Sequence, residues 1–432
     1  MDHPPLARDL TDAAQNQSVL DLASALLDGT VQAGELEGGR IAVTAEASAV
    51  ARARRRLAAL TAPVHLSVVW AMYGETGRIL PRTEHPHGED FVREKVRQLD
   101  WLTTELPVTW NIVAVDDGCP DRPSSAEAMA KIVATEGYPT AGHRSVTVVR
   151  LADVIARRTD LGPLGSALAA LASTDQSRKG GSILAGLVAA VQAGTPSASG
   201  TVRHLICSTD ADLSANLAQL GSLAAAIATG DGVVAALGQR YGMPDAVLVK
   251  PDGPHTEPRS TGGKPDKLII LFRHAVRAML IPALAHVLDT QAGFKAYDAT
   301  ALTPVLPQLA SFHETFDVEL LIRLASVHGS QALAVEPIVF TEDFAATNFP
   351  SVDPGPSHLA MVHQVVDIYD RLVAPTAPAV GEAAALLDLL RTLDLAGYVR
   401  LIEQLRREDD GDPTLFDRRW PVAHLADVVR GG

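Results

Sequence analysis

The first 60 residues carry hydrophobic positions at the spacing of a helix. Apolar side chains between Val19 and Leu27 recur three and four residues apart, so they lie on one face of a predicted helix. A second helix is predicted from Thr44, which we expect to cap its amino end, through the alanine-rich run that ends at Leu60. Residues 1–60 are therefore predicted to form a helical N-terminal extension.

From His65 onward, short runs rich in β-branched residues alternate with helical segments. The predicted strands are residues 66–70, 110–115, 145–150, 204–207 and 332–340, and the predicted helices are 91–104, 124–135, 180–192 and 317–327. This alternation is typical of βαβ units. The predicted fold class is α/β, with a Rossmann-like core and a mostly parallel sheet over residues 61–345.

Two stretches rich in Pro and Gly interrupt the pattern. Residues 251–266 (PDGPHTEPRSTGGKPD) predict a long loop, which in a compact domain is usually functional or disordered. From His358 the chain is predicted to be mostly helical, with a break at residues 374–378. Residues 346–432 are therefore a predicted helical C-terminal extension.

Composition narrows the function classes. Of the 432 residues, 47% are hydrophobic and 20% are charged, as in a folded enzyme. The formal net charge of −14 argues against a protein that binds nucleic acid, because phosphate backbones attract basic surfaces. Cys119 and Cys207 are the only cysteines, which gives no metal-site spacing and no disulfide framework, and favours reduced thiols in a cytoplasm.

Hydropathy predicts no transmembrane segment and no signal peptide. The longest apolar candidate, residues 275–288, contains Arg277, Pro282 and His286, so it could contact a membrane surface but not cross the bilayer. The amino terminus has no basic region followed by an apolar run. We therefore expect a cytoplasmic protein.

Two of the predicted strands end in side chains suited to a nucleoside. Tyr73 and Glu75 follow the first strand, and Asp116 and Asp117 follow the second, where Gly118 permits a tight turn. An aromatic ring can stack on a base, and a carboxylate can accept hydrogen bonds from a base or a ribose. Ligands of open α/β sheets bind at this edge. An Asp-Gly turn with solvated acids explains the second motif about equally well.

Basic and glycine residues open the helix predicted at residues 180–192. Lys179 precedes Gly180 and Gly181, and a helix amino terminus after glycines can present backbone N–H groups to an anion. The spacing is not that of a P-loop. An ordinary basic loop at a helix start is the alternative.

The sharpest motif follows the strand predicted at residues 204–207. Asp210 and Asp212 form an Asp-x-Asp pair, in which alternate side chains of an extended segment point the same way. Two carboxylates on one side suit a hard divalent cation that bridges a diphosphate. The sequence therefore predicts a site for Mg²⁺ or Mn²⁺.

In this order the four motifs resemble the family 2 glycosyltransferases of the GT-A fold. Residues 67–75 (SVVWAMYGE) are similar to the opening segment of that family. Downstream, residues 237–240 (LGQR), 289–295 (DTQAGFK) and 316–320 (FDVEL) are similar to its polyprenyl-phosphate branch, nearest to the dolichyl-phosphate β-glucosyltransferases. The resemblance covers about residues 65–345.

The resemblance implies a catalytic set of Asp317, Asp212 and Arg240. Asp212, with Asp210 nearby, would hold Mg²⁺ or Mn²⁺, and Arg240 would help to stabilise the departing diphosphate. Asp317 would be the general base for a hydroxyl acceptor. Alternatively, Asp317 is an acid that complements the dipole of its helix.

The resemblance also implies a nucleotide-sugar donor, expected to be a UDP-sugar, and inversion at the anomeric carbon. The residues implied in donor binding are Tyr73, Glu75, Asp116, Asp117, Lys179, Asp210 and Gln291. Ala71 and Gly74 replace residues typical of the family, and Ser214 stands where many relatives carry a further metal ligand.

The acceptor stays open at this point. The chain lacks the membrane helices of the branch. Its basic residues in the stretch that would meet a lipid phosphate do not lie at the positions typical of the branch; they are Lys264, Lys267, Arg273 and Arg277. A hydroxyl of a small molecule is the expected acceptor, and a polyprenyl phosphate, reached through residues 268–288, is the alternative. A sugar nucleotidyltransferase is more remote, since residues 70–77 are not a Gly-rich loop. A homo-oligomer is possible.

Overall fold

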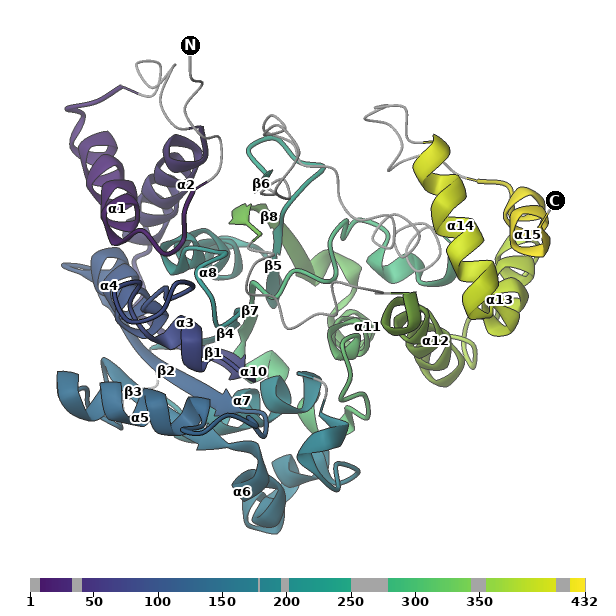
Figure 1. The fold of residues 1–432 in the computed structure, drawn as a ribbon, viewed down its shortest axis with the longest axis horizontal. Coiled ribbons are helices and arrows are strands. Elements are labelled where there is room, and N and C mark those ends of the chain that lie inside the picture. The colour runs from purple at the N-terminus through teal and green to yellow at the C-terminus, as the bar shows by residue number, and fades with distance from the viewer. Residues whose placement is uncertain are drawn as a thin grey trace.

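The computed structural model describes residues 8–32, 41–177, 179–195, 202–249, 279–342, 355–408 and 420–431. Its centre is a seven-stranded sheet with the strand order β3-β2-β1-β4-β7-β5-β8 (Figure 1). The strands are β1 (Val64–Met72), β2 (Val108–Asp116), β3 (Ser145–Arg150), β4 (Arg203–Ser208), β5 (Ala235–Gln239), β7 (Lys295–Asp298) and β8 (Leu333–Pro337). All neighbours pair in parallel except β7, which is antiparallel to β4 and to β5. The predicted α/β class with a mostly parallel sheet is confirmed.

Helices cover both faces of this sheet. The principal helices of the core are α4 (Phe91–Thr103), α5 (Ser125–Glu136), α6 (Leu151–Ala156), α7 (Gly180–Ala193), α8 (Leu220–Thr229) and α11 (Phe316–His328), with short helices α3 (Thr76–Ile79) and α10 (Ala299–Leu302). Along β1, Leu66 and Val68 enter one hydrophobic core with α4 and α8, whereas Val69 enters the other with α7 and α11. The alternation of side chains along a strand thus builds a core on each face.

The predicted strand at residues 332–340 is divided in two. Its first part is β8, which pairs with β5, and its second part is β9 (Val339–Thr341), which pairs with β6 (Val247–Val249) in a separate two-stranded sheet. Ile338 lies between the two parts. Its amide donates to the carbonyl of Gln239, and the carbonyl of Ile338 accepts from the amide of Val247. The chain therefore changes partners without a turn.

Where the structure describes the N-terminal extension, it forms two helices, α1 (Ala13–Asp28) and α2 (Ile41–Ala58). The expected cap at Thr44 is wrong, because α2 begins before it and the Thr44 carbonyl accepts from Ser48 Oγ inside the helix. The helices share the core of β1 and β2. Helix α8 approaches α2 so closely that a Cβ on Gly221 would lie 2.6 Å from the Ala53 carbonyl oxygen.

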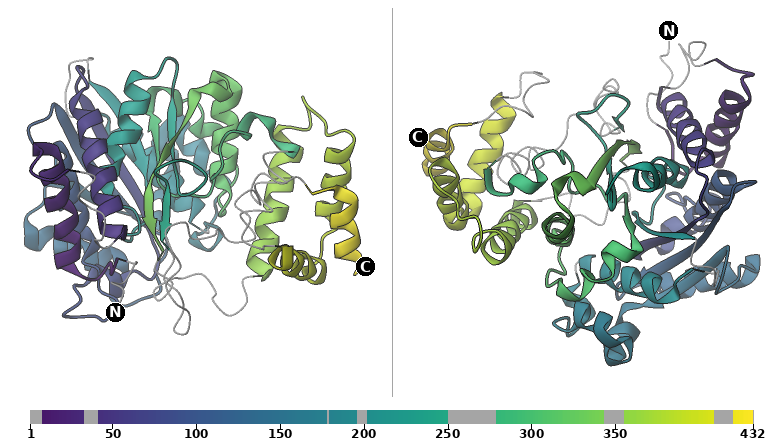
Figure 2. Two further views of the ribbon diagram at one scale, coloured as in Figure 1. Left: turned by 90° about the horizontal axis from the view of Figure 1, so that it is seen from above. Right: turned by 180° about the vertical axis from the view of Figure 1, so that it is seen from behind.

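Within residues 355–408 and 420–431, the C-terminal extension forms four helices, with a break at residues 373–381. They are α12 (Gly355–Leu372), α13 (Glu382–Thr392), α14 (Leu395–Glu408) and α15 (Val422–Arg430). Both views of Figure 2 place them at the end of the molecule opposite α1 and α2. Arg371 of α12 joins them to the core by an ion pair with Glu319 of α11, 3.2 Å away. The division of the chain into residues 1–60, 61–345 and 346–432 stays a prediction.

Three further points concern the sequence-based expectations. Within the described residues, no helix has the length and hydropathy needed to cross a bilayer. Cys119 and Cys207 are both buried as free thiols. The predicted loop at residues 251–266 and the four basic residues considered for a lipid phosphate lie outside the described residues.

Candidate functional site

The predicted site residues gather at one edge of the sheet. Strands β1, β2 and β4 run in parallel, so the residues that follow them emerge together at their carboxyl ends. Because β7 runs the other way, the segment before it reaches the same edge, where Ser208 Oγ donates to the carbonyl of Gly293 at 3.0 Å. Four loops therefore converge on this carboxyl edge.

Asp116 and Asp117, adjacent in the sequence, have different partners. Asp116 accepts from the amides of Gly118 (3.0 Å), Cys119 (2.9 Å) and Ala126 (2.9 Å), so both of its oxygens hold the loop and the start of α5. Asp117 instead accepts from the amide of Lys179 at 3.0 Å. Burial raises the pKa of the Asp117 carboxyl above its ordinary value. Asp117, rather than Asp116, is directed towards the other motifs.

Lys179 joins two of the predicted motifs. Its amide meets Asp117, and its Nζ contacts Asp210 Oδ1. The residue has a φ of +74°, an uncommon conformation for a side chain other than glycine. The Lys179 side chain is about half exposed, at 52%. This lysine therefore reaches from the amino end of α7 across to the loop after β4.

The glycines that follow Lys179 serve packing in this structure. A Cβ on Gly180 would lie 2.4 Å from the carbonyl oxygen of His313. The amide of Gly181 donates to Phe312 (3.1 Å), and the amide of Ser182 donates to Ser177 Oγ (3.0 Å). The expectation that these amides are free for an anion is therefore wrong for Gly181 and Ser182, because the chain itself uses them.

The two carboxylates of the Asp-x-Asp pair each contact a different cation. Asp210 meets Lys179, and Asp212 Oδ2 accepts from Arg78 at 2.9 Å while its Oδ1 accepts from the Ser214 amide at 3.1 Å. Burial opposes ionisation of Asp210, but Lys179 outweighs it and holds the pKa of that carboxyl well below its ordinary value. Both side chains keep some exposure, 24% for Asp210 and 17% for Asp212.

These carboxylates are suitable ligands for a hard divalent cation. Mg²⁺ in particular is usually held by one or two carboxylates that share it with phosphate oxygens and water. Among the described residues, no group of three His, Cys, Asp or Glu side chains could hold a metal by itself. Asp210 and Asp212 therefore fit a metal that a ligand phosphate helps to coordinate.

Arg78 is the central cation of the site, although no motif predicted it. Its guanidinium makes two hydrogen bonds to Glu75, at 2.7 and 3.0 Å, in addition to the bond to Asp212. Burial raises the pKa of the Glu75 carboxyl to about 7, against the opposing effect of Arg78. A spacing of three residues brings Glu75 and Arg78 together on one helical turn. That Glu-x-x-Arg spacing is the signal that could have found Arg78.

Arg240 lies in a buried pair of its own. Its Nε and Nη2 donate to the two oxygens of Asp289, at 2.6 and 3.0 Å, and its guanidinium lies 5.1 Å from the centre of the Phe340 ring. Asp289 also accepts from the amide of Ala292 at 3.1 Å. Although burial acts against ionisation, Arg240 holds the pKa of Asp289 below its ordinary value. Arg240 thus fixes the turn that contains Gln291.

Asp317 is buried in the first turn of α11. Lys295 Nζ contacts its Oδ2 at 2.9 Å, and Gln291 Nε2 and the Val318 amide donate to its Oδ1 at 3.2 and 2.9 Å. Burial raises the pKa of the Asp317 carboxyl, whereas Lys295 acts in the opposite direction. The charge of Asp317 also contributes to raising the pKa of Lys179, against burial and after the larger effect of Asp210. Two of the predicted residues, Gln291 and Asp317, are therefore in direct contact.

A lysine without a predicted role lies beneath the site. Lys95 of α4 is fully buried, and its Nζ lies 5.5 Å from the centre of the Trp70 ring. Among the residues that the structure describes, this Nζ has no hydrogen-bond partner. Burial lowers the pKa of Lys95 to about 8, although Asp212 and Asp210 oppose this change. The sequence does not predict that Lys95 is buried, because it occupies an ordinary polar position in the pattern of an amphipathic helix.

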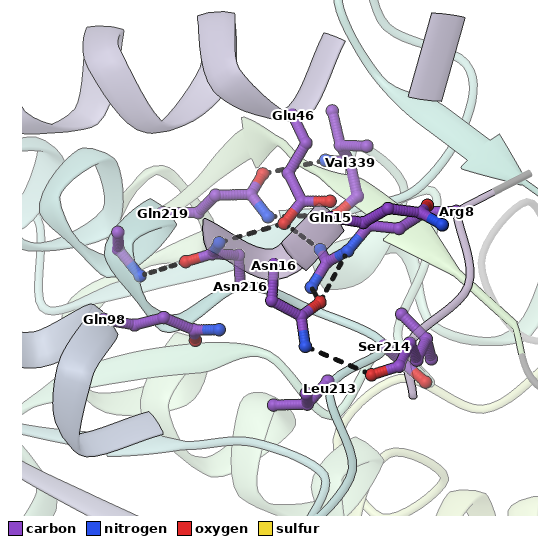
Figure 3. A network of polar contacts seen from close by, with 12 residues as sticks. Arg8, Gln15, Asn16, Glu46, Gln98, Leu213, Ser214, Asn216, Gln219 and Val339 are labelled. Carbon is purple, nitrogen blue, oxygen red and sulfur yellow. Dashed lines mark hydrogen bonds and ion pairs between the residues drawn. The ribbon is translucent and has the colours of Figure 1, made fainter. Parts of the chain in front are cut away.

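A buried polar network holds the loop that follows Asp212 (Figure 3). Arg8 forms an ion pair with Glu46 of α2, and Glu46 Oε1 accepts from Asn216 Nδ2 at 2.9 Å. The Leu217 amide donates to Gln98 of α4 at 2.8 Å. The N-terminal helices, to which the sequence analysis assigned no chemistry, thus support the loop of the Asp-x-Asp pair.

Of the predicted residues, Tyr73 and Lys179 have the most exposed side chains. Tyr73 is 50% exposed directly after β1, whereas Glu75, Asp117 and Asp317 are buried. The contacts among the predicted residues form three groups: Glu75 with Asp212 through Arg78, Asp117 with Asp210 through Lys179, and Gln291 with Asp317.

No protein-family model matches this chain, and no curated protein matches its sequence. Among solved structures, it is similar to glucosyl-3-phosphoglycerate synthase from Mycobacterium tuberculosis in complex with Mn²⁺, UDP-glucose and phosphoglyceric acid. The sequence identity is 15%, the TM-score is 0.45, and the match covers 74% of this chain and 84% of that chain. The same enzyme with Mn²⁺ and UDP-glucose gives 15% identity and a TM-score of 0.44, over 74% and 83% of the two chains. This likeness concerns the path of part of the chain.

Proposed function

We propose that this chain is a metal-dependent glycosyltransferase that moves a sugar from a UDP-sugar to a hydroxyl of a small-molecule acceptor, with inversion at the anomeric carbon. The observation that carries the proposal is the linked set of charges at the carboxyl edge: Lys179 joins Asp117 to Asp210, and Arg78 joins Glu75 to Asp212. A nucleotide sugar needs acceptors for its nucleoside and cations for its diphosphate, and this edge offers both.

The strand order supports this assignment. Because β2, β1, β4 and β7 are consecutive in the sheet, Asp117, Glu75, the Asp-x-Asp pair and Gln291 follow one another along its edge. This order matches the nucleoside, diphosphate and sugar of an extended donor. Tyr73, which is exposed and lies two residues before Glu75, would stack on the base. Asp116 has its oxygens committed to the loop, so the proposal gives the nucleoside contact to Asp117.

Asp210 and Asp212 would hold Mg²⁺ or Mn²⁺ together with the donor phosphates. When bound, such a metal neutralises charge that develops on the leaving diphosphate. Lys179 supplies a second, permanent positive charge at the same place. Arg240, held by Asp289, adds positive potential at the end of β5 and fixes the turn of Gln291.

Asp317 would take the proton of the attacking hydroxyl. A general base must be ionised before it acts, and the ion pair with Lys295 favours that form within a buried site. Gln291 orients the carboxylate from the side of β7. In-line attack on the face of the sugar opposite the diphosphate then inverts the anomeric carbon.

The test is a panel of UDP-, GDP- and dTDP-sugars, with and without Mn²⁺, scored by thermal shift and by release of the nucleoside diphosphate. A ligand that binds the folded chain raises its Tm. We expect one UDP-sugar to raise the Tm only when Mn²⁺ is present. Asp212→Asn should lose this shift and most of the turnover, whereas Asp231→Asn, an exposed aspartate after α8, should behave as wild type.

Three results would contradict the proposal. They are the absence of any nucleotide-sugar shift, turnover that a chelator leaves unchanged, and an Asp212→Asn variant with normal activity. Release of sugar 1-phosphate when pyrophosphate is added as the acceptor of the nucleotidyl group, instead of release of the nucleoside diphosphate, would indicate nucleotidyl transfer. Transfer to a polyprenyl phosphate in vesicles, but to no soluble hydroxyl, would replace the small-molecule acceptor with a lipid.

A further inference from the structure

We propose that Arg78 is a built-in competitor of the divalent metal, so that Asp212 becomes a metal ligand only when a nucleotide diphosphate draws Arg78 away. This inference rests on the proposed function and adds to it a coupling between metal and donor. Its basis is the position of Arg78, whose Nη1 lies 2.9 Å from Asp212 Oδ2. The guanidinium thus occupies a carboxylate oxygen that a metal would need.

The charges around Arg78 make this a built arrangement. Its side chain is 10% exposed and lies among three carboxylates: Glu75 at 2.7 Å, Asp212 at 2.9 Å and Glu89 at 4.0 Å. Glu89 is itself fixed, because its Oε2 accepts from the Leu213 amide at 2.7 Å. Leu213, the neighbour of Asp212, thereby fixes Glu89, which is one of the three acids around Arg78. A partly desolvated guanidinium is stable in this place because these anions surround it.

The other carboxylate of the pair is occupied in the same way. Lys179 Nζ contacts Asp210 Oδ1, so both acids of the Asp-x-Asp pair have a cation of the chain itself. No third metal-ligating side chain is in place among the described residues. A metal ion that arrives alone would therefore have to displace a protein cation and would gain only two carboxylates.

A diphosphate changes this balance. Arg prefers bidentate contacts with phosphate, and Lys binds phosphate as a point charge, so the donor offers new anionic partners to both Arg78 and Lys179. As these side chains turn towards the phosphates, Asp212 and Asp210 are released for the metal. The two ligands then strengthen each other's binding, and by linkage each does so by the same factor.

If Arg78 has only a structural role, its removal should change the affinity for the metal in the opposite direction. If the residue only tied α3 to the loop after β4, its removal would loosen Asp212 and weaken metal binding. If it competes, its removal frees the carboxylate and tightens metal binding. An adjacent arginine lowers the proton affinity of a carboxylate by about 10- to 1000-fold, and we expect at least the lower end of this range for a metal.

The experiment measures free Mn²⁺ by electron paramagnetic resonance during titration of the full chain, without and with saturating UDP. The variants are Arg78→Gln, Arg78→Lys and, as the matched control, Arg82→Gln. Arg82 is exposed and pairs with Asp9 at 2.6 Å, away from Asp212. We expect Arg78→Gln to bind Mn²⁺ alone about tenfold or more tightly than wild type. Arg78→Lys keeps the charge and should remain close to wild type, as should Arg82→Gln.

Two results would overturn the proposal while leaving the proposed function intact. One is an Arg78→Gln variant that binds Mn²⁺ alone with unchanged or weaker affinity. The other, which needs no variant to fold, is a wild-type chain that binds Mn²⁺ equally well without and with UDP. A wild-type chain that binds neither Mn²⁺ nor any nucleotide would instead reject the proposed function itself.

Discussion

Lys295 and Asp317 form a buried ion pair, with Lys295 Nζ 2.9 Å from Asp317 Oδ2. Lys295 begins β7 and Asp317 lies in the first turn of α11, so the pair fixes the helix against the centre of the sheet. The two side chains are only 3% and 6% exposed. Burial raises the pKa of the Asp317 carboxyl while Lys295 favours its ionised form, and a carboxyl with a raised pKa beside a fixed cation suits the base that we propose.

Replacing Asp317 with Asn should separate the two classes of acceptor. A hydroxyl must lose its proton during attack, and a positioned base contributes about 10²- to 10⁴-fold to the rate. We therefore expect Asp317→Asn to lower kcat within that range while the Kd for the donor is nearly unchanged. Initial rates and donor titrations on the same preparation measure both quantities.

The control for this variant concerns stability. Asp317→Asn leaves Lys295 buried without its anion, and breaking a buried pair costs about 3–5 kcal/mol. Lys295→Met disturbs the same pair but keeps the carboxylate, so it should lose stability while retaining more activity per folded molecule. Transfer by Asp317→Asn at a rate near wild type would remove Asp317 from the chemistry and favour a phosphate acceptor.

The ion pair of Arg8 and Glu46 should matter far more for folding than the surface pair on the same helix. In Glu46→Gln, Arg8 stays buried without a counter-charge, and we expect a loss of about 3–5 kcal/mol in the free energy of unfolding. Arg52 and Asp245 are 35% and 64% exposed, so Asp245→Asn should cost about 0–1 kcal/mol. Urea unfolding measures both. Equal losses would mean that the network of Figure 3 does not anchor α2.

The elements that could be predicted are those with a long hydrophobic pattern of their own. The strands around Val68 and Ile112 and the helix from Phe91 were predicted within about three residues of their observed ends, because each buries a continuous or periodic apolar set. Strand β7 was missed. It has four residues, begins with Lys295 and ends with Asp298, and only its neighbours β4 and β5 make it a strand.

The residues of the site also fall into those that the sequence predicts and those that it does not. Acids at strand ends could be found, because the strand period shows where each strand stops. Of their cations, Lys179 was predicted, but Arg78 and Lys95 were not, since they reach the site from the helices α3 and α4 and resemble surface residues in the sequence. Sequence also could not separate Asp116 from Asp117, whose different roles depend on backbone amides of α5 and α7. Which acid meets which cation is a property of the tertiary structure.

A buried and a half-buried histidine predict a loss of stability in mild acid. His65 and His204 lie side by side on β1 and β4, with ring centres 5.2 Å apart, and burial lowers the pKa of each to about 4. Between pH 6.5 and 4 the unfolded chain binds two protons that the folded chain does not. As the pH is lowered through this window, the free energy of unfolding should therefore fall, by up to about 1.4 kcal/mol per pH unit for each histidine.

Urea unfolding of His204→Gln from pH 7.5 to 4.5 tests this prediction. The variant keeps a polar group near Ser67 Oγ, which lies 2.8 Å from His204 Nε2, but it cannot take up the proton. Below pH 6.5, the free energy of unfolding of the variant should depend less steeply on pH, because its unfolded chain takes up about one proton fewer. His328, exposed at the end of α11, provides the control substitution His328→Gln. A slope unchanged by His204→Gln would contradict the assignment.

Gly293 gives the most selective test of where Asp210 must lie. A Cβ at this position would stand 2.8 Å from Asp210 Oδ1 and 2.9 Å from Oδ2, closer than carbon and oxygen atoms pack. The backbone of Gly293 is not in the left-handed region, so Gly293→Ala brings a steric contact without backbone strain. The carboxylate is free to turn away from that contact, but it then leaves Lys179 Nζ.

We therefore expect Gly293→Ala to fold normally and to lose activity. A displacement of about 1 Å at a reacting centre can cost about 10²-fold in rate, so kcat/KM for the donor should fall by that order. Gly186→Ala is the matched contrast, because a Cβ there would meet Val69 Cγ1 at 2.3 Å in the core between α7 and β1. Overpacking of this kind costs about 1–3 kcal/mol of stability, and its activity per folded molecule should be nearly unchanged. Calorimetry and initial rates on both variants separate the two effects. Wild-type kcat/KM in Gly293→Ala would show that the chemistry does not depend on where the Asp210 carboxylate lies.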